Sequence, residues 1–215
     1  IMAMTDPVQV NQYPQNMPLL QSDCNTLRRA YDHDYDLRSI EEDTLGDYSQ
    51  IWDLQFLIDE DPPELVFDLE TQGLHPYREE CEILTLQFCP EPGRAYLMSW
   101  DHPDDPMPKR MRKKIKQQLR ELLCQQDRDI IGQNLKYDAS WMLARMGIHF
   151  RMAHDTIMLA ATHDENLQNK DLDTLTKIFA PEMAGYADRF NATYDKSDMA
   201  SVPLNEIIDY GCGDV

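Results

Sequence analysis

A short apolar segment at residues 65–70, with the sequence LVFDLE, ends in two acids that are two positions apart. The alternation of a β-strand places Asp68 and Glu70 on one face, together with Val66, and the remaining apolar residues on the other. Two carboxylates beside buried apolar neighbours are costly unless a cation compensates them. The segment therefore predicts a buried strand whose carboxyl end carries either a divalent-cation site or an exposed pair of acids.

A second motif, GQNLKYD at residues 132–138, follows a predicted short strand at 129–132 and opens a predicted helix over about 135–146. Asn134 is of a residue type that caps helix N-termini. Asp138 falls in the first helical turn, where its negative charge interacts favourably with the helix dipole. Helix capping alone accounts for both residues, so this motif acquires a chemical meaning only in combination with others.

A third motif lies in a helix predicted over 203–215, with Pro203 near its start, where a missing N–H is tolerated. Tyr210 and Asp214 are four residues apart and project from one face of this helix. Taken separately, they are explained as a tyrosine in the core and an exposed acid.

The remaining pattern predicts strands at 82–89 and 94–100, joined by the turn residues PEPG, and an amphipathic helix over 107–126. Shorter helices are predicted at 48–58, 155–163 and 171–179. Residues 1–46 are predicted to be a poorly structured extension and residues 47–63 a short helix with a proline-rich break, which leaves a main domain at 64–215. The order of elements predicts an α/β fold, in which a mixed sheet has helices on both faces.

The net charge of −19 argues against a protein that binds nucleic acid by charge alone. Residues 1–60 hold twelve Asp or Glu and only three Lys or Arg, so much of the excess lies outside the three motifs. Bound divalent ions also invert the potential of an acidic site, and another domain is then expected to grip most of the nucleic acid. No apolar run reaches the roughly 20 residues of a membrane span, so no membrane partner is expected.

Six Lys or Arg residues lie between positions 109 and 116, and Arg120 follows on the same predicted helix. They have two explanations, a surface that faces DNA or a solvated helix face in an acidic protein. We favour the solvated face. The five cysteines lack CxxC spacing and are interpreted as reduced thiols of a cytosolic compartment.

In this order, DLE, GQNLKYD and YGCGD resemble the motifs of the 3′→5′ exonuclease domain of family A DNA polymerases, the proofreading domain of DNA polymerase I-like enzymes. The resemblance covers roughly residues 50–215. It implies a ribonuclease H-like fold with a mixed five-stranded sheet flanked by helices. The family's histidine branch has His five residues before the last acid, a position that is Asp209 here, so the tyrosine branch (DEDDy) applies.

The resemblance also implies roles for individual residues. Asp68, Glu70, Asp138 and Asp214 would hold two divalent ions, Mg²⁺ or Mn²⁺, and Tyr210 would orient the attacking water. Leu74 is either a wedge against the terminal base or an ordinary apolar loop residue. The positions expected near the terminal nucleotide are Thr71, Leu74, Gln133, Asn134 and Tyr137.

The expected reaction is hydrolysis of the terminal phosphodiester of a single-stranded or frayed DNA 3′ end, which releases a nucleoside 5′-monophosphate. Because the chain stops at Val215, directly after Asp214, we expect a fragment, a proteolysed product or the ordered part of a larger protein, in which a polymerase domain follows. The expected location is the cytoplasm of a bacterium or of a phage-infected host. Two alternatives stay open. One is a processing exoribonuclease of the same fold, and the other is an inactive exonuclease-fold scaffold, which the intact set of acids disfavours.

Overall fold

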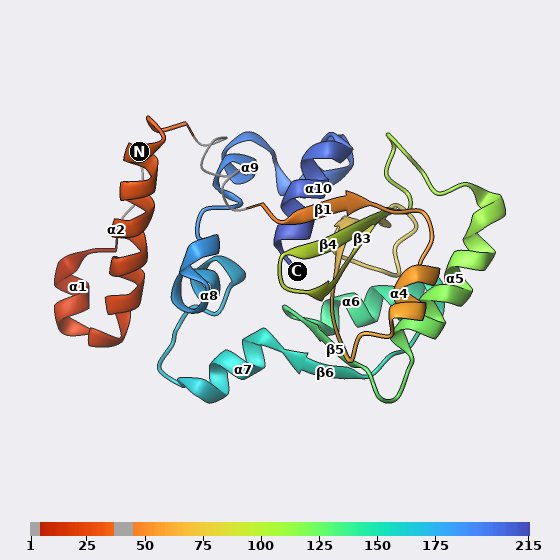
Figure 1. Ribbon diagram of the computed structural model, residues 1–215, viewed down its shortest axis with the longest axis horizontal. Helices are drawn as coiled ribbons and strands as arrows, with labels where there is room; N and C mark the ends of the chain where they lie inside the picture. Colours follow the sequence, from red (N-terminus) through yellow and green to blue (C-terminus); the bar gives the residue numbers. More distant parts are fainter. Residues whose placement is uncertain (1–4, 37–44) are drawn as a thin grey trace. The chain divides into compact units, whose positions relative to one another are not determined.

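The computed structural model of the chain describes residues 5–36 and 45–215, which form two compact units (Figure 1). The first, here called the sheet unit, comprises residues 46–156 and 194–215. The second, here called the helical unit, comprises residues 157–193 and the described residues that precede Gly46. All three motifs lie in the sheet unit, which is described first.

Six strands form one mixed sheet in the order β1-β4-β3-β2-β5-β6. Strand β3 runs antiparallel to β2 and β4, whereas the pairs β1–β4, β2–β5 and β5–β6 are parallel. The strands are β1 (Asp47–Gln50), β2 (Glu64–Gln72), β3 (Glu82–Glu91), β4 (Arg94–Ser99), β5 (Asp129–Gly132) and β6 (Met152–Asp155). This architecture matches the expected ribonuclease H-like fold class.

The sheet has one strand more than the five expected, and the region predicted as a helix over 48–58 differs. It consists of β1 followed by the shorter helix α4 (Gln55–Glu60). Residues 47–50 pair in register with residues 94–97 of β4, and the amide of Asp47 donates to the carbonyl of Gly93. Pairing with β4, which is distant in the sequence, therefore overrides the local apolar pattern and makes β1 an edge strand of the sheet. Strand β6 was also not among the strands assigned from the pattern.

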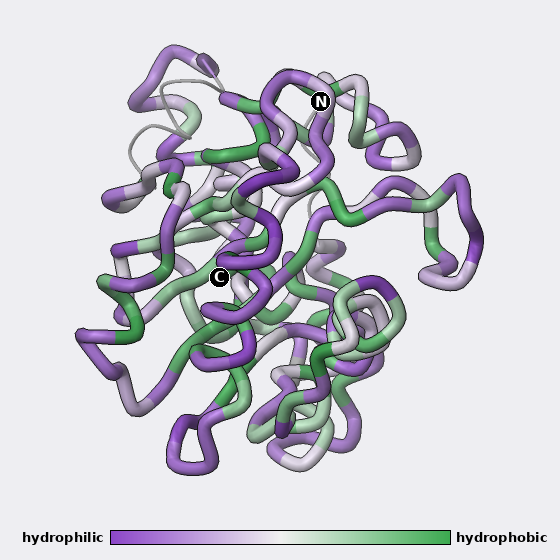
Figure 2. The backbone as a smooth tube through the Cα atoms, turned by 90° about the vertical axis from the view of Figure 1, so that its right-hand side faces the viewer, coloured by the Kyte–Doolittle hydropathy of each residue, from purple (hydrophilic) through white to green (hydrophobic). Residues whose placement is uncertain are grey.

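Strand β2 carries the core on one face and the acids on the other. Phe67 and Leu69 are buried and lie opposite Phe88 and Leu86 of β3. The apolar face of α5 (Lys109–Leu123), with Ile115 among its buried residues, belongs to the same core cluster. Figure 2 shows that the projecting loops are mostly hydrophilic, whereas the segments between them carry the hydrophobic residues.

Helices cover both faces of the sheet, as predicted. Helix α10 (Leu204–Gly213) contacts β1, β2, β3 and β4, and in Figure 1 it lies across the strands from α4 and α6 (Lys136–Trp141). A π-helical turn, η2 (Met142–Met146), continues α6, and the two together span the helix predicted over 135–146. The segment η4 (Lys196–Ser201) precedes α10.

The helical unit contains α1 (Pro7–Gln12), η1 (Pro14–Asn16) and α2 (Met17–Asp32) from the region expected to have limited structure. In α2, Ala30 is buried, and the Arg29 side chain donates to the carbonyl of Ala184 at 2.9 Å. These contacts join α2 to a region about 150 residues away in the sequence. The polar composition of residues 1–46 does not reveal such contacts, so limited structure was expected there. The rest of the extension, residues 1–4 and 37–44, lies outside the described residues.

The other helices of this unit are α8 (Leu172–Phe179), η3 (Pro181–Met183) and α9 (Asp188–Thr193), and α7 (Thr156–His163) leads into it. Helices α7 and α8 lie within a residue of the predicted bounds. Among the described residues, no helix combines the length and the apolar character needed to span a bilayer.

Candidate metal centre

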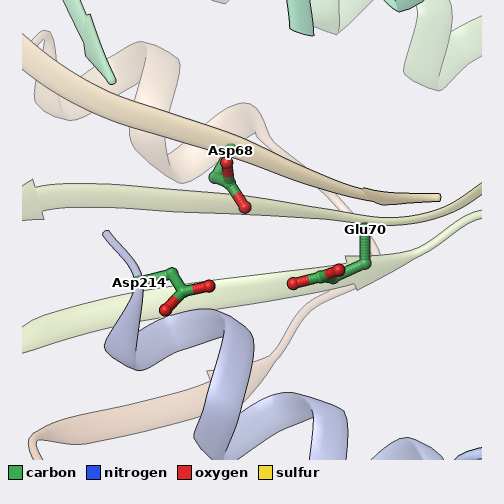
Figure 3. A group of neighbouring side chains, drawn as sticks. All are labelled: Asp68, Glu70 and Asp214. Atoms are coloured by element: carbon green, nitrogen blue, oxygen red, sulfur yellow. The ribbon is translucent and has the colours of Figure 1, made fainter. Parts of the chain in front are cut away.

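Three of the predicted acids converge on one point of the sheet unit. Asp68 and Glu70 extend from the same face of β2, and Asp214 follows the last turn of α10. Figure 3 shows their carboxylates pointing into a common space. One carboxylate oxygen from each of the three lies within 4.8 Å of the others. Residues separated by about 145 positions in the sequence thus form one cluster of oxygen ligands.

Strand β3 supplies a polar floor beneath the two acids of β2. Gln87 lies opposite Asp68 and Thr85 lies opposite Glu70, and both β3 residues are fully buried. The Gln87 side-chain amide donates to the Thr85 hydroxyl at 2.7 Å. Gly211 of α10 lies directly over Gln87, where a Cβ atom would be 2.7 Å from its Nε2. The absence of a side chain at Gly211 therefore lets α10 approach the sheet closely enough to deliver Asp214.

The fourth acid, Asp138, lies in the first turn of α6 and stands outside the group of three. It is buried, with 1% of its surface exposed, and its Oδ1 atom has no hydrogen-bond partner in the described part of the chain. Its charge nevertheless acts on Asp68, where it is the largest contribution after burial to a raised pKa. The charges of all four predicted acids thus interact in one region of the structure.

Burial and mutual repulsion oppose the ionisation of Asp68, Glu70 and Asp138. Burial raises the pKa of Asp138 to about 8 and outweighs the backbone hydrogen bonds that lower it. The pKa of Asp68 is raised well above its usual range by burial and then by the charges of Asp138, Glu70 and Asp214. The pKa of Glu70 is raised likewise by burial and Asp214, although Lys196 opposes this rise. A nearby cation stabilises the ionised form of such neighbouring carboxyl groups.

The start of α6 differs from its prediction. Asn134 was expected to cap the helix, but its φ angle of 54° is left-handed and the helix begins at Lys136 without a side-chain cap. The carboxylate of Asp155 accepts the backbone N–H groups of Asn134 and Leu135 instead, at 3.2 and 2.9 Å. Asp155 ends β6 and lies in register with Gly132 at the end of β5, so parallel pairing brings it to these amides.

Two of the predicted substrate-contacting residues form a joint network. The hydroxyl groups of Thr71 and Tyr137 are 2.7 Å apart, and both donate to the carbonyl of Gly73, at 3.0 and 3.3 Å. A β-bulge between Glu70 and Thr71 changes the register at this point of β2. Such irregularities re-aim side chains beside functional sites. The network ties the strand that carries Asp68 to the helix that carries Asp138.

The remaining predicted positions have different surroundings. Leu74 lies on the loop that follows β2. Its side chain is 74% exposed and is therefore accessible to a ligand. The side chain of Gln133 accepts a hydrogen bond from the hydroxyl of Thr156.

Tyr210 is buried one turn before Asp214, and its hydroxyl accepts a hydrogen bond from the ammonium group of Lys196 at 2.8 Å. Lys196 was not predicted as a site residue, and neither was Asp155. No helical spacing rule connects Lys196 to Tyr210, because α10 begins only after Pro203 and the two residues therefore lie in different elements. The only local signal is a lone lysine in an acidic segment.

The donor set fits a hard divalent ion. Each of the four acids offers carboxylate oxygen, the ligand type that Mg²⁺ and Mn²⁺ prefer. The unpartnered buried oxygen of Asp138 and the repulsion around Asp68 are both relieved by positive charge at this place. We therefore regard Asp68, Glu70, Asp138 and Asp214 as a candidate metal centre.

A protein-family model described as 3′-5′ exonuclease matches residues 52–215, which include all four acids and Tyr210. No curated protein sequence matches the chain.

Solved structures share the fold at low sequence identity. NrnC of Brucella melitensis bound to pGG has a TM-score of 0.56 and 16% identity, over 80% of this chain and 75% of NrnC. The same protein with bound Mg²⁺ has a TM-score of 0.51 and 17% identity over the same shares. RNase D of Escherichia coli, described as an exoribonuclease involved in structured RNA processing, has a TM-score of 0.53 and 16% identity, over 79% of this chain but only 41% of RNase D.

Proposed function

Because the chain belongs to the 3′-5′ exonuclease family, we propose that its acidic centre hydrolyses the terminal phosphodiester at the 3′ end of a nucleic-acid strand with two divalent metal ions. The observation that carries this proposal is the convergence of Asp68, Glu70 and Asp214 within 4.8 Å, beside the buried Asp138. An inactive scaffold has no need to keep four acids in a site where they destabilise one another.

The four acids would bind the two metal ions. Asp68, Glu70 and Asp214 would hold one ion, and Asp68 with Asp138 the second. When bound, such ions supply Lewis acidity and a water of lowered pKa. In the proposed hydrolysis, the oxygen of a water molecule would bond to the terminal phosphorus while the bond from that phosphorus to the 3′ oxygen of the preceding nucleotide breaks, and that 3′ oxygen would take up a proton. The products are a nucleoside 5′-monophosphate and a strand, one nucleotide shorter, that ends in a 3′ hydroxyl.

Tyr210 would orient the attacking water through its phenol oxygen. The hydrogen bond from Lys196 restrains that oxygen, and burial restrains the ring. Thr71 and Tyr137, whose hydroxyls are joined beside Gly73, would contact the terminal nucleotide. Gln133 and Asn134 border the same helix start, and Leu74 would pack against the terminal base.

For the substrate we propose a single-stranded or frayed DNA 3′ end, trimmed in the manner of a proofreading domain that serves a DNA polymerase in a longer polypeptide. The motif GQNLKYD supports this choice, because it matches the form found in DNA polymerase I. A second candidate is an exoribonuclease, which is favoured by the structural likeness to NrnC bound to pGG and to RNase D.

The test compares 5′-labelled single strands of DNA and RNA with the same sequence, incubated with Mn²⁺ or with EDTA. We expect stepwise shortening that requires the metal, with DNA degraded faster than RNA. Faster degradation of RNA would select the second candidate. If neither strand is shortened at high enzyme concentration, or if shortening persists in EDTA, the proposed mechanism is wrong.

A further inference from the structure

A basic groove of about 430 Å³ lies on the sheet unit between the start of α5, the beginning of β3, the end of β4 and η2. We call it the α5 groove. Five cationic side chains line it, namely Lys109, Arg112, Lys113, Lys116 and Arg145, together with three acidic ones. A quarter of all Lys and Arg residues of a chain with a net charge of −19 thus gather around one cavity.

The charge on α5 is unfavourable for the isolated helix. Six of its first eight residues are Lys or Arg, and no acid occurs before Glu121. The N-terminal end of a helix carries the positive end of its dipole, so cations there raise the free energy of the folded state. A cost of this kind, with no compensation along the helix, is typical of functional surfaces.

Some of these cations already have partners, and others do not. Arg112 pairs with Asp101, which removes one of the three acids of the groove as a competitor. Lys114, on another face of the helix, pairs with Asp53. Within the described residues, Lys109 and Lys113 form no hydrogen bond or ion pair. Two ammonium groups at the groove therefore remain available to an anion, although Glu79 and Glu82 also line it.

The groove adjoins the metal centre through the loop at residues 73–81. Gly73, whose carbonyl joins Thr71 and Tyr137, lies against Cys81, which lines the groove. Arg145 holds the far end of this loop by donating to the carbonyls of Arg78 and Cys81. It projects from the π-helical turn η2, a kind of irregularity that is frequent at functional sites.

The surface of that loop is suited to nucleotides. Leu74 and Tyr77 are 74% and 79% exposed, so both large side chains lie on the outside of the loop. Bases of single strands stack on exposed aromatic rings without regard to sequence. Because the loop runs from Gly73 to Cys81, a strand that left the metal centre across it would arrive at the α5 groove.

We propose that the α5 groove binds the phosphate backbone of the substrate strand on the 5′ side of its cleaved end. This inference rests on the proposed function and extends it from the terminal bond to longer substrates. It also assigns the basic face of α5 to nucleic acid, where the sequence alone favoured a solvated surface. A backbone contact of this kind is independent of base identity.

The experiment compares two double variants of equal charge change on the same helix. Lys109→Gln/Lys113→Gln removes the free ammonium groups of the groove. Arg110→Gln/Lys114→Gln removes two cations outside it, also four residues apart. Binding of a 5′-fluorescein-labelled 20-nucleotide single strand, of DNA and of RNA, is measured by fluorescence anisotropy in EDTA at several salt concentrations. The same oligonucleotides and a dinucleotide are then used for turnover with Mn²⁺.

We expect the groove variant to bind the 20-nucleotide strand about five- to tenfold more weakly at low salt, with the slope of log Kd against log salt reduced by about 1.4, because two phosphate contacts are lost. Its turnover of the dinucleotide should stay within about twofold of wild type, and the control variant should behave as wild type throughout. Equal losses in both double variants, no loss in the groove variant, or an equal loss on the dinucleotide would each overturn the proposal.

Because anisotropy in EDTA requires no cleavage, it separates this proposal from the proposed function. If the wild type binds the strand through Lys109 and Lys113 but never cleaves it, the groove proposal stands and the proposed exonuclease activity is refuted. If the wild type cleaves the strand and the Lys109→Gln/Lys113→Gln variant binds and cleaves it equally well, the exonuclease stands and the groove proposal is refuted.

Discussion

The ammonium group of Lys196 lies 2.8 Å from the phenol oxygen of Tyr210 and 4.5 Å from the centre of its ring. The same charge lowers the pKa of Glu70, against the rise caused by burial. Lys196 thus acts on both Tyr210 and Glu70, and we propose that it is a positioning residue.

We expect Lys196→Ala to lower kcat by about 10- to 100-fold, the range for residues that orient catalytic groups. KM should change little, because the substrate contacts assigned above do not involve Lys196. Lys196→Arg, which keeps a cationic donor, should recover part of the loss, whereas Lys196→Met should not. Steady-state kinetics on a single strand would refute the assignment if Lys196→Met were as active as wild type.

Substitutions at the centre should follow a definite order. Asp68→Ala removes the carboxylate shared by both proposed ions and should be among the most damaging changes. Tyr210→Phe deletes one hydroxyl and no metal ligand, so its loss should be smaller, within the roughly 10²–10⁴-fold range for groups that assist proton transfer. Single-turnover rates with saturating Mn²⁺ give the comparison. A dead Tyr210→Phe beside an active Asp68→Ala would reverse the two roles.

Gly211→Ala should disturb the delivery of Asp214 to the centre. The new methyl group would lie 2.7 Å from Nε2 of the buried Gln87, and overpacking of this kind costs about 1–3 kcal/mol. Activity should fall with stability. Because the clash is with one side chain, the double variant Gly211→Ala/Gln87→Ala should be more active than Gly211→Ala alone. Strictly additive effects in this cycle would show that the two residues are not in contact.

In the absence of metal, stability should fall as pH rises. Asp138 has a usual pKa of 3.8 and a pKa of about 8 in the fold, so the folded state retains a proton that the unfolded state has lost. Between these values the free energy of unfolding decreases by up to about 1.4 kcal/mol per pH unit for such a group. Urea unfolding in EDTA between about pH 5 and pH 8 measures this slope. Saturating Mn²⁺ should flatten it, and an unfolding free energy that increases with pH in EDTA would contradict the burial of Asp138.

Much of the fold was predictable because its signals are local. The apolar alternation around Asp68 gives β2, and the periodicity of α5 and α10 gives their bounds to within a few residues. Strands β1 and β6 have only four residues each, and they exist because of pairing with β4 and β5. Short strands of this kind have no period long enough to recognise in the sequence.

Some residues of the candidate site could likewise be predicted from the sequence, and others could not. Its acids were found through motif order, whereas Lys196 and Asp155 were missed because only the tertiary structure brings them to Tyr210 and to the amides before α6. Asn134 shows the opposite error. Its residue type suits a helix cap, but the parallel register of β5 and β6 places a better acceptor, Asp155, at the same amides.

Whether the four carboxylates share one metal centre is tested by thermal unfolding of wild type and Asp138→Asn in EDTA and in Mn²⁺. Since Mn²⁺ binds only the folded arrangement, it should raise the Tm of wild type, and at 100-fold over the dissociation constant it should add about 2.7 kcal/mol to the free energy of unfolding. Asp138→Asn removes a buried acid that the fold must either keep protonated or leave charged among other acids, so this variant should be more stable than wild type in EDTA and gain less from Mn²⁺. A wild type indifferent to Mn²⁺, with an Asp138→Asn protein no more stable in EDTA, would contradict the central claim.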